Sequence, residues 1–202
     1  MTLVEELVIK RLGRVDYLPT WEAMRAFTRG RDDSTPDELW LLEHRPVYTL
    51  GQGTPLKSIP GAIPVVKTDR GGDVTYHGPG QIVIYTLVDL ARRSIKVKRF
   101  VWLLEQAVID LLHPIPAERR AGAPGVYVEG AKIAALGIRV VRGRAYHGLA
   151  LNVDMDLSPF SAIDPCGYPG LRVTQVKDLG LALDVDTAGS RLIEDLVKKL
   201  DA

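Results

Sequence analysis

The chain is short of cysteine, of net charge and of long apolar runs. Only Cys166 is a cysteine among the 202 residues, so no disulfide can form within the chain, and we expect a reducing, cytoplasmic compartment. One cysteine and four dispersed histidines do not predict a metal site. The formal net charge of +1 gives no overall signature of nucleic-acid binding.

Membrane and nucleotide signals are missing as well. No apolar run approaches the length of a membrane span, and Glu5 and Glu6 stand where a signal peptide would carry basic residues. The chain has no Gly-x-x-x-x-Gly-Lys-Ser/Thr phosphate loop and no Gly-x-Ser-x-Gly nucleophile elbow. Gly51-Gln52-Gly53 lacks the third glycine and the following helix of a dinucleotide fingerprint. These absences exclude a phosphate-loop site, a nucleophile elbow and a dinucleotide-binding site.

What the chain does have is the composition of an ordinary globular domain. Its hydrophobic fraction is 46% and its charged fraction is 25%, and its length is sufficient for a core without disulfides. Periodicity predicts strands over residues 4–12, 38–43, 46–50, 62–66, 82–90, 125–128, 131–141 and 146–153, helices over 19–30, 100–113 and 190–200, and a helical turn at 158–163. Strands and helices interleave, so we predict one α+β, or mixed α/β, domain over residues 1–202 with a sheet at its centre.

The densest functional signal lies in residues 70–81, Arg-Gly-Gly-Asp-Val-Thr-Tyr-His-Gly-Pro-Gly-Gln. This stretch joins two apolar runs, 62–66 and 82–90, that we expect to be buried strands. A turn needs fewer residues and fewer glycines, whereas glycine also lets a ligand approach the backbone closely. We predict a ligand-binding loop in which Arg70 binds an anion or braces the loop. The alternative is an ordinary long connection with a solvated His77.

Cys166 is the candidate nucleophile. Prolines and glycines surround it in Asp-Pro-Cys-Gly-Tyr-Pro-Gly at residues 164–170, which predicts a rigid loop rather than the apolar setting of a core cysteine. A nucleophilic thiol needs a nearby cation. Lys132 opens an otherwise apolar strand face, which indicates either a lysine snorkelling at the end of a sheet or one aimed at a site. Taken with the loop cysteine, Lys132 becomes the second member of a candidate catalytic dyad.

Two histidines, His77 and His147, each precede a glycine. Each is a candidate donor to a carbonyl or a phosphate, and the alternative is a partly buried histidine with satisfied hydrogen bonds. We expect His77 to have an auxiliary role beside the dyad.

Five blocks of sequence, taken together, resemble the motifs of the lipoyl(octanoyl) transferases. They are Arg70-Gly71-Gly72 through Thr75, His77-Gly78-Pro79-Gly80-Gln81, Lys132-Ile133-Ala134-Ala135-Leu136-Gly137, His147-Gly148 through Val153, and Pro165-Cys166-Gly167 through Thr174. The stretch from Arg45 to Gly51 is similar to the family as well. The blocks keep their order over residues 41–180, which is far more specific than any one motif. Gln175 departs from the pattern, because a serine is commoner there.

The resemblance implies the fold of biotin and lipoate protein ligases, a central mixed sheet with flanking helices. It implies that Cys166 takes an octanoyl group from octanoyl-acyl carrier protein as a thioester, and that Lys132 activates the thiol and serves acid–base chemistry. The group then passes to a lysine of a lipoyl domain, in 2-oxoacid dehydrogenase complexes or glycine cleavage H protein, without ATP, metal or cofactor. The substrate-binding residues implied by the motif matches are Arg70, Gly71, Gly72, Asp73, Val74, Thr75, Tyr76, His77, Ala135, Leu136, Gly137, Gly148, Leu149 and Ala150.

We expect a monomer that binds neither membranes nor nucleic acid and that docks acidic protein substrates. The candidate docking clusters are Arg92, Arg93, Lys96, Lys98 and Arg99, then Arg119 with Arg120, then Arg142 with Arg144. The alternative for each cluster is a solvated charged surface.

The sequence leaves three alternatives for the function. An ATP-dependent lipoate or biotin ligase on the same fold would need an adenylate site and no loop cysteine. A non-catalytic acyl-binding or lipoyl-binding module would form no covalent adduct. A cysteine hydrolase would release free octanoate.

Overall fold

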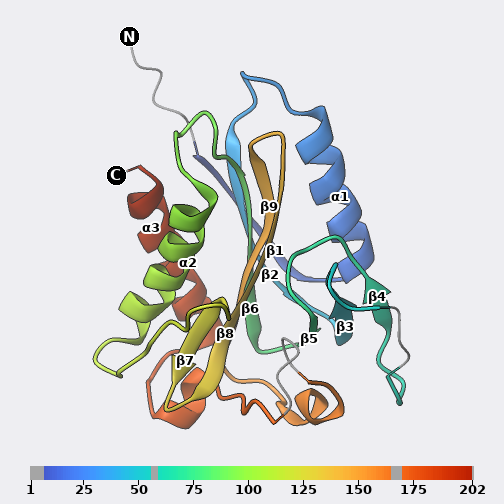
Figure 1. Cartoon of the computed structure of the whole chain (residues 1–202). Helices are drawn as coiled ribbons and strands as arrows, with labels where there is room; N and C mark the ends of the chain where they lie inside the picture. Colours follow the sequence, from blue (N-terminus) through green and yellow to red (C-terminus); the bar gives the residue numbers. More distant parts are fainter. Residues whose placement is uncertain (1–6, 56–58, 165–169, 202) are drawn as a thin grey trace.

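Figure 1 shows a computed structural model of the chain, with a sheet at its centre and helices on both faces. The structure describes residues 7–55, 59–164 and 170–201. Cys166, the predicted nucleophile, lies outside the described residues. Along the described part of the chain, no helix is both long enough and apolar enough to span a membrane.

Six strands form the large sheet, in the order β1-β2-β6-β9-β8-β7. Their bounds are Leu7–Val15 for β1, Asp37–His44 for β2, Gln81–Asp89 for β6, Gly125–Val128 for β7, Ala131–Val141 for β8 and Arg144–Asn152 for β9. β1 pairs in parallel with β2, whereas the other neighbours are antiparallel, so the sheet is mixed. Every residue of β6 is buried, because this central strand is covered on both faces.

Helices cover the two faces of the large sheet. α2 (Val97–Leu112) and α3 (Val185–Leu200) lie on one face, and α1 (Tyr17–Gly30) lies on the other (Figure 1). The buried apolar side chains of α2 recur at helical spacing and form one stripe, which consists of Phe100, Leu103, Leu104, Ala107, Val108 and Leu112. This stripe packs with α3 and the sheet into the main core of the molecule.

A second, three-stranded sheet stands beside the large one. Its order is β4-β3-β5, formed by Val65–Lys67, Val47–Leu50 and Val74–His77. It has an apolar cluster of its own, closed by Phe160 from a 3-10 helix at Ser158–Ala162. A further 3-10 helix at Val176–Leu179 leads towards α3.

The predicted mixed α/β architecture is confirmed, with shifts at the ends of several elements. β7 and β8 have the predicted bounds, and β6, β9, α1 and α2 differ from the prediction by a few residues. α3 begins at Val185 rather than at Ser190, because Asp184 caps it by accepting a hydrogen bond from the Thr187 N–H at 2.7 Å.

Two predictions on the small sheet are wrong. Residues 70–81 are not one continuous loop, because Val74–His77 forms β5 and pairs antiparallel with β3. The sequence Val-Thr-Tyr favours a strand, and the pairing satisfies its backbone groups. The buried strand expected at 62–66 is reduced to Val65–Lys67, whose residues are half-buried or exposed.

Candidate active site

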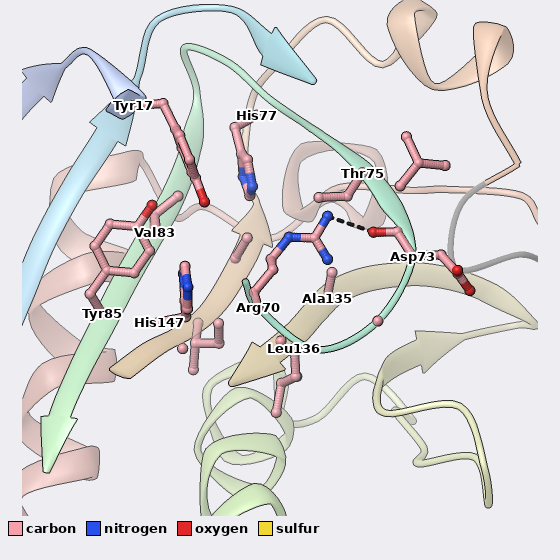
Figure 2. A pocket seen from close by; sticks show the side chains of 16 residues that line it. Tyr17, Arg70, Asp73, Thr75, His77, Val83, Tyr85, Ala135, Leu136 and His147 are labelled. Atoms are coloured by element: carbon pink, nitrogen blue, oxygen red, sulfur yellow. Dashed lines mark hydrogen bonds between the residues drawn. The ribbon is translucent and has the colours of Figure 1, made fainter. Parts of the chain in front are cut away.

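A pocket opens between residues 70–77 and strands β8 and β9 of the large sheet. Its empty space, with the open solvent at its mouth included, is about 480 Å³. Figure 2 shows Tyr17, Tyr85 and His147 together at one end, with Asp73 and Thr75 at the other. The full lining is Tyr17, Arg70, Gly72, Asp73, Val74, Thr75, His77, Val83, Tyr85, Ala135, Leu136, Gly137, His147, Gly148, Leu149 and Ala150.

The structure brings most of the predicted substrate-binding residues together. All of them line this pocket except Gly71 and Tyr76. Along β5, Thr75 and His77 face the pocket, so the intervening Tyr76 points into the apolar cluster of the small sheet. Gly71 ties its loop to β8 instead, since its N–H donates to the carbonyl of Ile138 at 3.1 Å.

Three lining residues were not predicted: Tyr17, Val83 and Tyr85. Val83 and Tyr85 are alternate residues of β6, so the period of two was a usable signal once that strand was assigned. Tyr17 begins α1, far away in the chain, and nothing local in the sequence connects it with the pocket. His147, predicted as a hydrogen-bond donor, lies beside these residues (Figure 2).

Two glycines allow the walls of the pocket to approach each other. A Cβ on Gly148 would lie 2.0 Å from the Ile84 carbonyl oxygen, so β9 and β6 could not keep their present separation. A Cβ on Gly137 would lie 2.9 Å from the Gly71 carbonyl oxygen, where the loop crosses β8. Neighbouring Ala135 and Ala150 are small as well, which leaves a slot over the sheet rather than a filled core.

Arg70 braces the loop, which was one of its two predicted roles. The side chain is buried, and its guanidinium donates to the backbone carbonyls of Gly71 at 2.9 Å, Asp73 at 2.6 Å and Thr49 at 2.7 Å. Figure 2 shows the bond to Asp73 as a dashed line. The same group donates to the Thr49 hydroxyl at 2.9 Å. Arg70 therefore holds the loop against β3 of the small sheet.

A buried chain of hydrogen bonds leads from Arg70 to His77. The Thr49 oxygen accepts from Arg70, so the hydroxyl hydrogen is directed to His77 Nε2, 3.4 Å away. His77 Nδ1 lies 2.7 Å from Gln81 Oε1. The oxygen of an amide can only accept, so Nδ1 carries the ring proton and donates it to Gln81. His77 is thus held by partners at both ring nitrogens.

The chain continues from Gln81 to the neighbourhood of Lys132. The Gln81 amide nitrogen donates to Asn152 Oδ1 at 3.0 Å, and the Asn152 nitrogen donates to the Thr174 carbonyl at 3.0 Å. The Thr174 N–H in turn donates to the Lys132 carbonyl at 3.0 Å. A continuous polar path of hydrogen bonds therefore joins Arg70 and His77, which line the pocket, with Lys132 at the start of β8.

Burial keeps the histidines around the pocket uncharged. It lowers the pKa of His77 to about 3, with the nearby His44 as a second cause, and lowers the pKa of His44 to about 4. Burial also lowers the pKa of His147, although a hydrogen bond to Asp69 opposes the shift. Tyr85 donates to His44 Nε2 at 2.6 Å, and burial raises the pKa of Tyr85 well above its usual value. The three histidines and Tyr85 therefore make this end of the pocket polar without carrying charge themselves.

His147 has an unusual backbone and a charged partner. Its φ of 62° lies in the left-handed region, and Thr86 Oγ1 donates to its carbonyl at 3.0 Å. Its Nε2 donates to Asp69 Oδ1 at 2.9 Å, and among the described residues Nδ1 has no hydrogen-bond partner. Burial acts to raise the pKa of Asp69, but hydrogen bonds from His147, Tyr146 and Trp21 outweigh it and hold that pKa below its usual range. Asp69, which was not predicted, orients His147.

Lys132 is buried at the beginning of β8, with 4% of its surface exposed, so it does not snorkel into solvent. Its Nζ donates to the Pro124 carbonyl at 3.1 Å and lies 5.3 Å from the centre of the Tyr127 ring. Its backbone N–H donates to the Arg172 carbonyl at 2.8 Å. A buried ammonium in this position can stabilise an anion that forms beside it.

The dyad of Cys166 with Lys132 stays a prediction, because Cys166 lies outside the described residues. The described segment 170–174 follows it along the chain, and Val173 forms a parallel bridge with Lys132. Among the side chains that the structure describes, no three of His, Cys, Asp and Glu are close enough to hold a metal ion.

The mixed sheet flanked by helices is the architecture of the lipoate and biotin protein ligase catalytic domains. A bipartite lipoate protein ligase from Thermoplasma acidophilum superposes with a TM-score of 0.69 at 17% identity, over 96% of this chain and 84% of that chain. A biotin protein ligase from Aquifex aeolicus superposes with a TM-score of 0.61 at 12% identity, over 96% of this chain and 70% of that chain. At such identities the likeness concerns the fold.

Sequence similarity shows which family within this structural class the chain belongs to. The model of the lipoyl protein ligase A/B catalytic domain matches residues 16–197. An octanoyltransferase from Aromatoleum aromaticum is 62% identical over 200 residues, which cover 96% of this chain and 86% of that protein. One from Dechloromonas aromatica is 60% identical over 200 residues, covering 96% of this chain and 97% of that protein. The chain belongs to this family and to its octanoyltransferases, which are acyltransferase enzymes, so the resemblance of the motifs is confirmed.

Proposed function

We propose that the chain transfers an octanoyl group from octanoyl-acyl carrier protein to a lysine of a lipoyl domain, in the cytoplasm, as a step of lipoate biosynthesis. The observation that carries the proposal is the position of Lys132. This buried cation lies on β8 three residues before Ala135, where the lining of the slot begins, and the segment that follows Cys166 pairs with it. Identity to octanoyltransferases over nearly the whole chain supports the same reaction.

The first step forms an acyl-enzyme. The Cys166 thiolate attacks the thioester carbonyl of the carrier protein, and the tetrahedral oxyanion collapses by breaking the bond to the carrier's thiol. The Lys132 ammonium stabilises the thiolate before the attack and gives a proton to the departing thiolate. One thioester replaces another, so the step is nearly thermoneutral and needs no ATP.

The second step forms the product. The amine of the acceptor lysine attacks the Cys166 thioester, loses a proton to Lys132, and the cysteine leaves as thiolate. An amide is more stable than a thioester, so this step draws the whole reaction forward. The acceptors are lipoyl domains of 2-oxoacid dehydrogenase complexes or glycine cleavage H protein. Donor and acceptor use the same cysteine in turn, so the kinetics are ping-pong.

The slot suits a saturated chain. Gly137, Gly148 and Ala150 leave space above the sheet, and Leu136 and Leu149 supply apolar contact. Burial of each methylene contributes about 0.8 kcal/mol, so the slot binds the chain through its length rather than through polar contacts. The acyl carbon lies towards Lys132, and the terminal methyl group lies towards Tyr85 and His147.

Intact-mass spectrometry of the chain mixed with octanoyl-acyl carrier protein, with ATP omitted, tests the proposal. We expect the mass of one octanoyl group to be added to the wild-type chain and to disappear when a lipoyl domain is supplied. Cys166→Ala should show neither the adduct nor transfer. Ser161→Ala, an exposed substitution in the neighbouring 3-10 helix, is the matched control and should behave as wild type.

The alternatives give different results in the same experiment. Transfer that requires ATP indicates a ligase, binding without an adduct indicates a binding module, and release of octanoate faster than amide formation indicates a hydrolase. Undiminished transfer by Cys166→Ala would refute the proposed nucleophile.

A further inference from the structure

A separate open groove lies at the β7–β8 turn, which precedes Lys132 along the chain. Its lining comes from three segments that meet at the β7–β8 turn and consists of Arg120, Ala121, Ala123, Tyr127, Gly130, Gly170, Leu171 and Arg172. Along the chain, Gly130 directly precedes β8, Lys132 is near its start, and the acyl slot begins at Ala135. Lys132 therefore lies between the groove and the slot.

Two arginines converge in this groove over Gly130. A Cβ placed on Gly130 would lie 3.3 Å from Arg120 Nη2 and 3.9 Å from Arg172 Nη2, so one small anion in front of this glycine would be within reach of both side chains. The Arg120 guanidinium carbon lies 4.4 Å from the centre of the Tyr127 ring, the same ring that Lys132 Nζ approaches to 5.3 Å. The groove is thus connected to the candidate active site through a single side chain.

The charge of these arginines is little compensated. Arg172 donates to the Glu129 carbonyl at 2.9 Å and forms no ion pair with any carboxylate among the described residues. Arg120 faces Glu118 at 3.6 Å, but both side chains are largely exposed, so the pair is weak. The positive charge of the groove is therefore available to a ligand.

Four arginines of the predicted docking clusters differ from Arg120 and Arg172, because they pair with buried carboxylates. Arg92 and Arg93 bind the buried carboxylate of Asp37 at 2.8 and 2.5 Å, whereas Lys96, Lys98 and Arg99 of the same cluster are exposed. Arg119 lies 3.3 Å from Glu105, and Arg144 lies 3.2 Å from Asp89. The charge of these four arginines is compensated inside the molecule.

We propose that Arg120 and Arg172 bind the phosphate of the prosthetic arm on which the acyl thioester is delivered. The inference rests on the proposed function, which brings the thioester to Lys132 with the acyl chain in the slot. The leaving thiol and its arm must then extend to the other side of Lys132, which is the side of the groove. The arm of an acyl carrier protein is attached through a phosphodiester, and two guanidinium groups suit a phosphate better than any other side chain.

Three octanoyl thioesters that differ in their leaving group test this site. Octanoyl-N-acetylcysteamine has no phosphate, octanoyl-4′-phosphopantetheine has the phosphate alone, and octanoyl-acyl carrier protein has both phosphate and protein. For the double variant Arg120→Ala, Arg172→Ala we expect KM to rise about tenfold or more with the two phosphate-bearing donors, since each lost bond is charge-assisted, while kcat changes little. KM for octanoyl-N-acetylcysteamine should stay at the wild-type value, which also shows that the variant is folded.

One control variant and two contrary outcomes complete the test of the phosphate site. Arg45→Ala removes an exposed arginine that pairs with Asp16, and it should leave all three KM values unchanged. A loss that is equal for all three donors would overturn the proposal, because it would indicate damage to the site itself. A raised KM for the carrier protein but not for octanoyl-4′-phosphopantetheine would also overturn it, since the arginines would then bind acidic side chains of the carrier. If the wild type transfers octanoate from none of the donors, the proposed function itself fails.

Discussion

Three histidines lie at or beside the slot over the sheet, and each would have to gain a proton to be charged. Burial lowers the pKa of His44 to about 4 and that of His77 to about 3, and it lowers the pKa of His147 as well. In an unfolded chain the pKa of histidine is about 6.5. Between these values the unfolded chain binds more protons than the folded chain, so acidification favours unfolding.

We predict that the free energy of unfolding is constant above about pH 7 and falls as the pH is lowered from about 6.5 towards 4. Each histidine that stays neutral in the fold contributes a slope of up to about 1.4 kcal/mol per pH unit. His77→Gln removes one of these titrating groups, so it should reduce the slope by up to about 1.4 kcal/mol per pH unit. Urea denaturation at several pH values measures it, and a His77→Gln chain with the wild-type slope would contradict this assignment.

The sequence predicted which residues line the pocket better than it predicted their hydrogen-bond partners. The sequence allowed Arg70 either to bind an anion or to brace its loop. The structure favours the second role, because the backbone carbonyls of Thr49 and Asp73 accept hydrogen bonds from Arg70. Asp69 had no local signal, because its role depends on His147, a residue of a distant strand. Hydrogen-bond partners of this kind are set by tertiary structure, which one sequence read alone does not contain.

Among the elements, β6 and β9 carry the polar path that links the slot with Lys132. Asn152 accepts from Gln81 and donates to the Thr174 carbonyl, so it positions residues 172–174 without touching substrate. Asn152→Asp keeps an acceptor for Gln81 and loses the donor. We predict that it lowers kcat at least about tenfold, lowers the free energy of unfolding by about 1–3 kcal/mol, and leaves KM for octanoyl-N-acetylcysteamine nearly unchanged.

Tyr48→Phe is the matched control for Asn152→Asp. It removes a part-buried hydrogen bond of 2.8 Å to the Pro159 carbonyl, far from Lys132 along the chain. Its loss of stability should be similar, and its kcat should be that of the wild type. If both variants lower kcat equally, the effect of Asn152 is one of general stability and not of positioning.

The elements of the large sheet were more predictable than those of the small one. Residues 131–141 form a long run with a clear pattern, and β8 has the predicted bounds. β5 is short and flanked by glycines, so its four residues looked like part of a loop until their partner β3 was known. Short strands depend on pairing more than on their own sequence.

At the scale of the whole molecule, one buried carboxylate joins distant parts of the chain. Asp37 is fully buried and accepts hydrogen bonds from Arg31 at 2.6 Å, Arg92 at 2.8 Å and Arg93 at 2.5 Å. Arg93 also donates to the carbonyl of Leu200, the last residue of α3, at 3.0 Å. This cluster connects the end of α1, the start of β2, the segment after β6 and the C-terminal helix.

We predict that Asp37→Asn lowers the free energy of unfolding by about 3–5 kcal/mol, because three guanidinium groups would lose their buried counter-charge. Asp201→Asn is the control, since Asp201 pairs with Arg93 at 3.2 Å but is half exposed, and it should cost less than about 1 kcal/mol. Urea denaturation at neutral pH compares the two. Equal losses would mean that the buried position of Asp37 is unimportant.

The architecture as a whole was predictable because two independent kinds of information agreed. Interleaved strands and helices indicated a mixed α/β domain, and the ordered motifs from Arg70 to Thr174 indicated one particular fold of that class. The division into two sheets was not predictable from spacing, because the strands at residues 38–43 and 46–50 are neighbours in sequence but pair with different partners.

Arg70 holds the wall of the slot through the backbone carbonyls of Gly71 and Asp73. A backbone carbonyl is present whatever the side chain, so these contacts of Arg70 do not depend on which side chain stands at position 75, which faces the slot. Natural variation or directed evolution can therefore remodel the lining one residue at a time while the scaffold stays intact. If the slot holds the acyl chain as proposed, variants with a preference for shorter or longer chains are accessible from this chain by small steps.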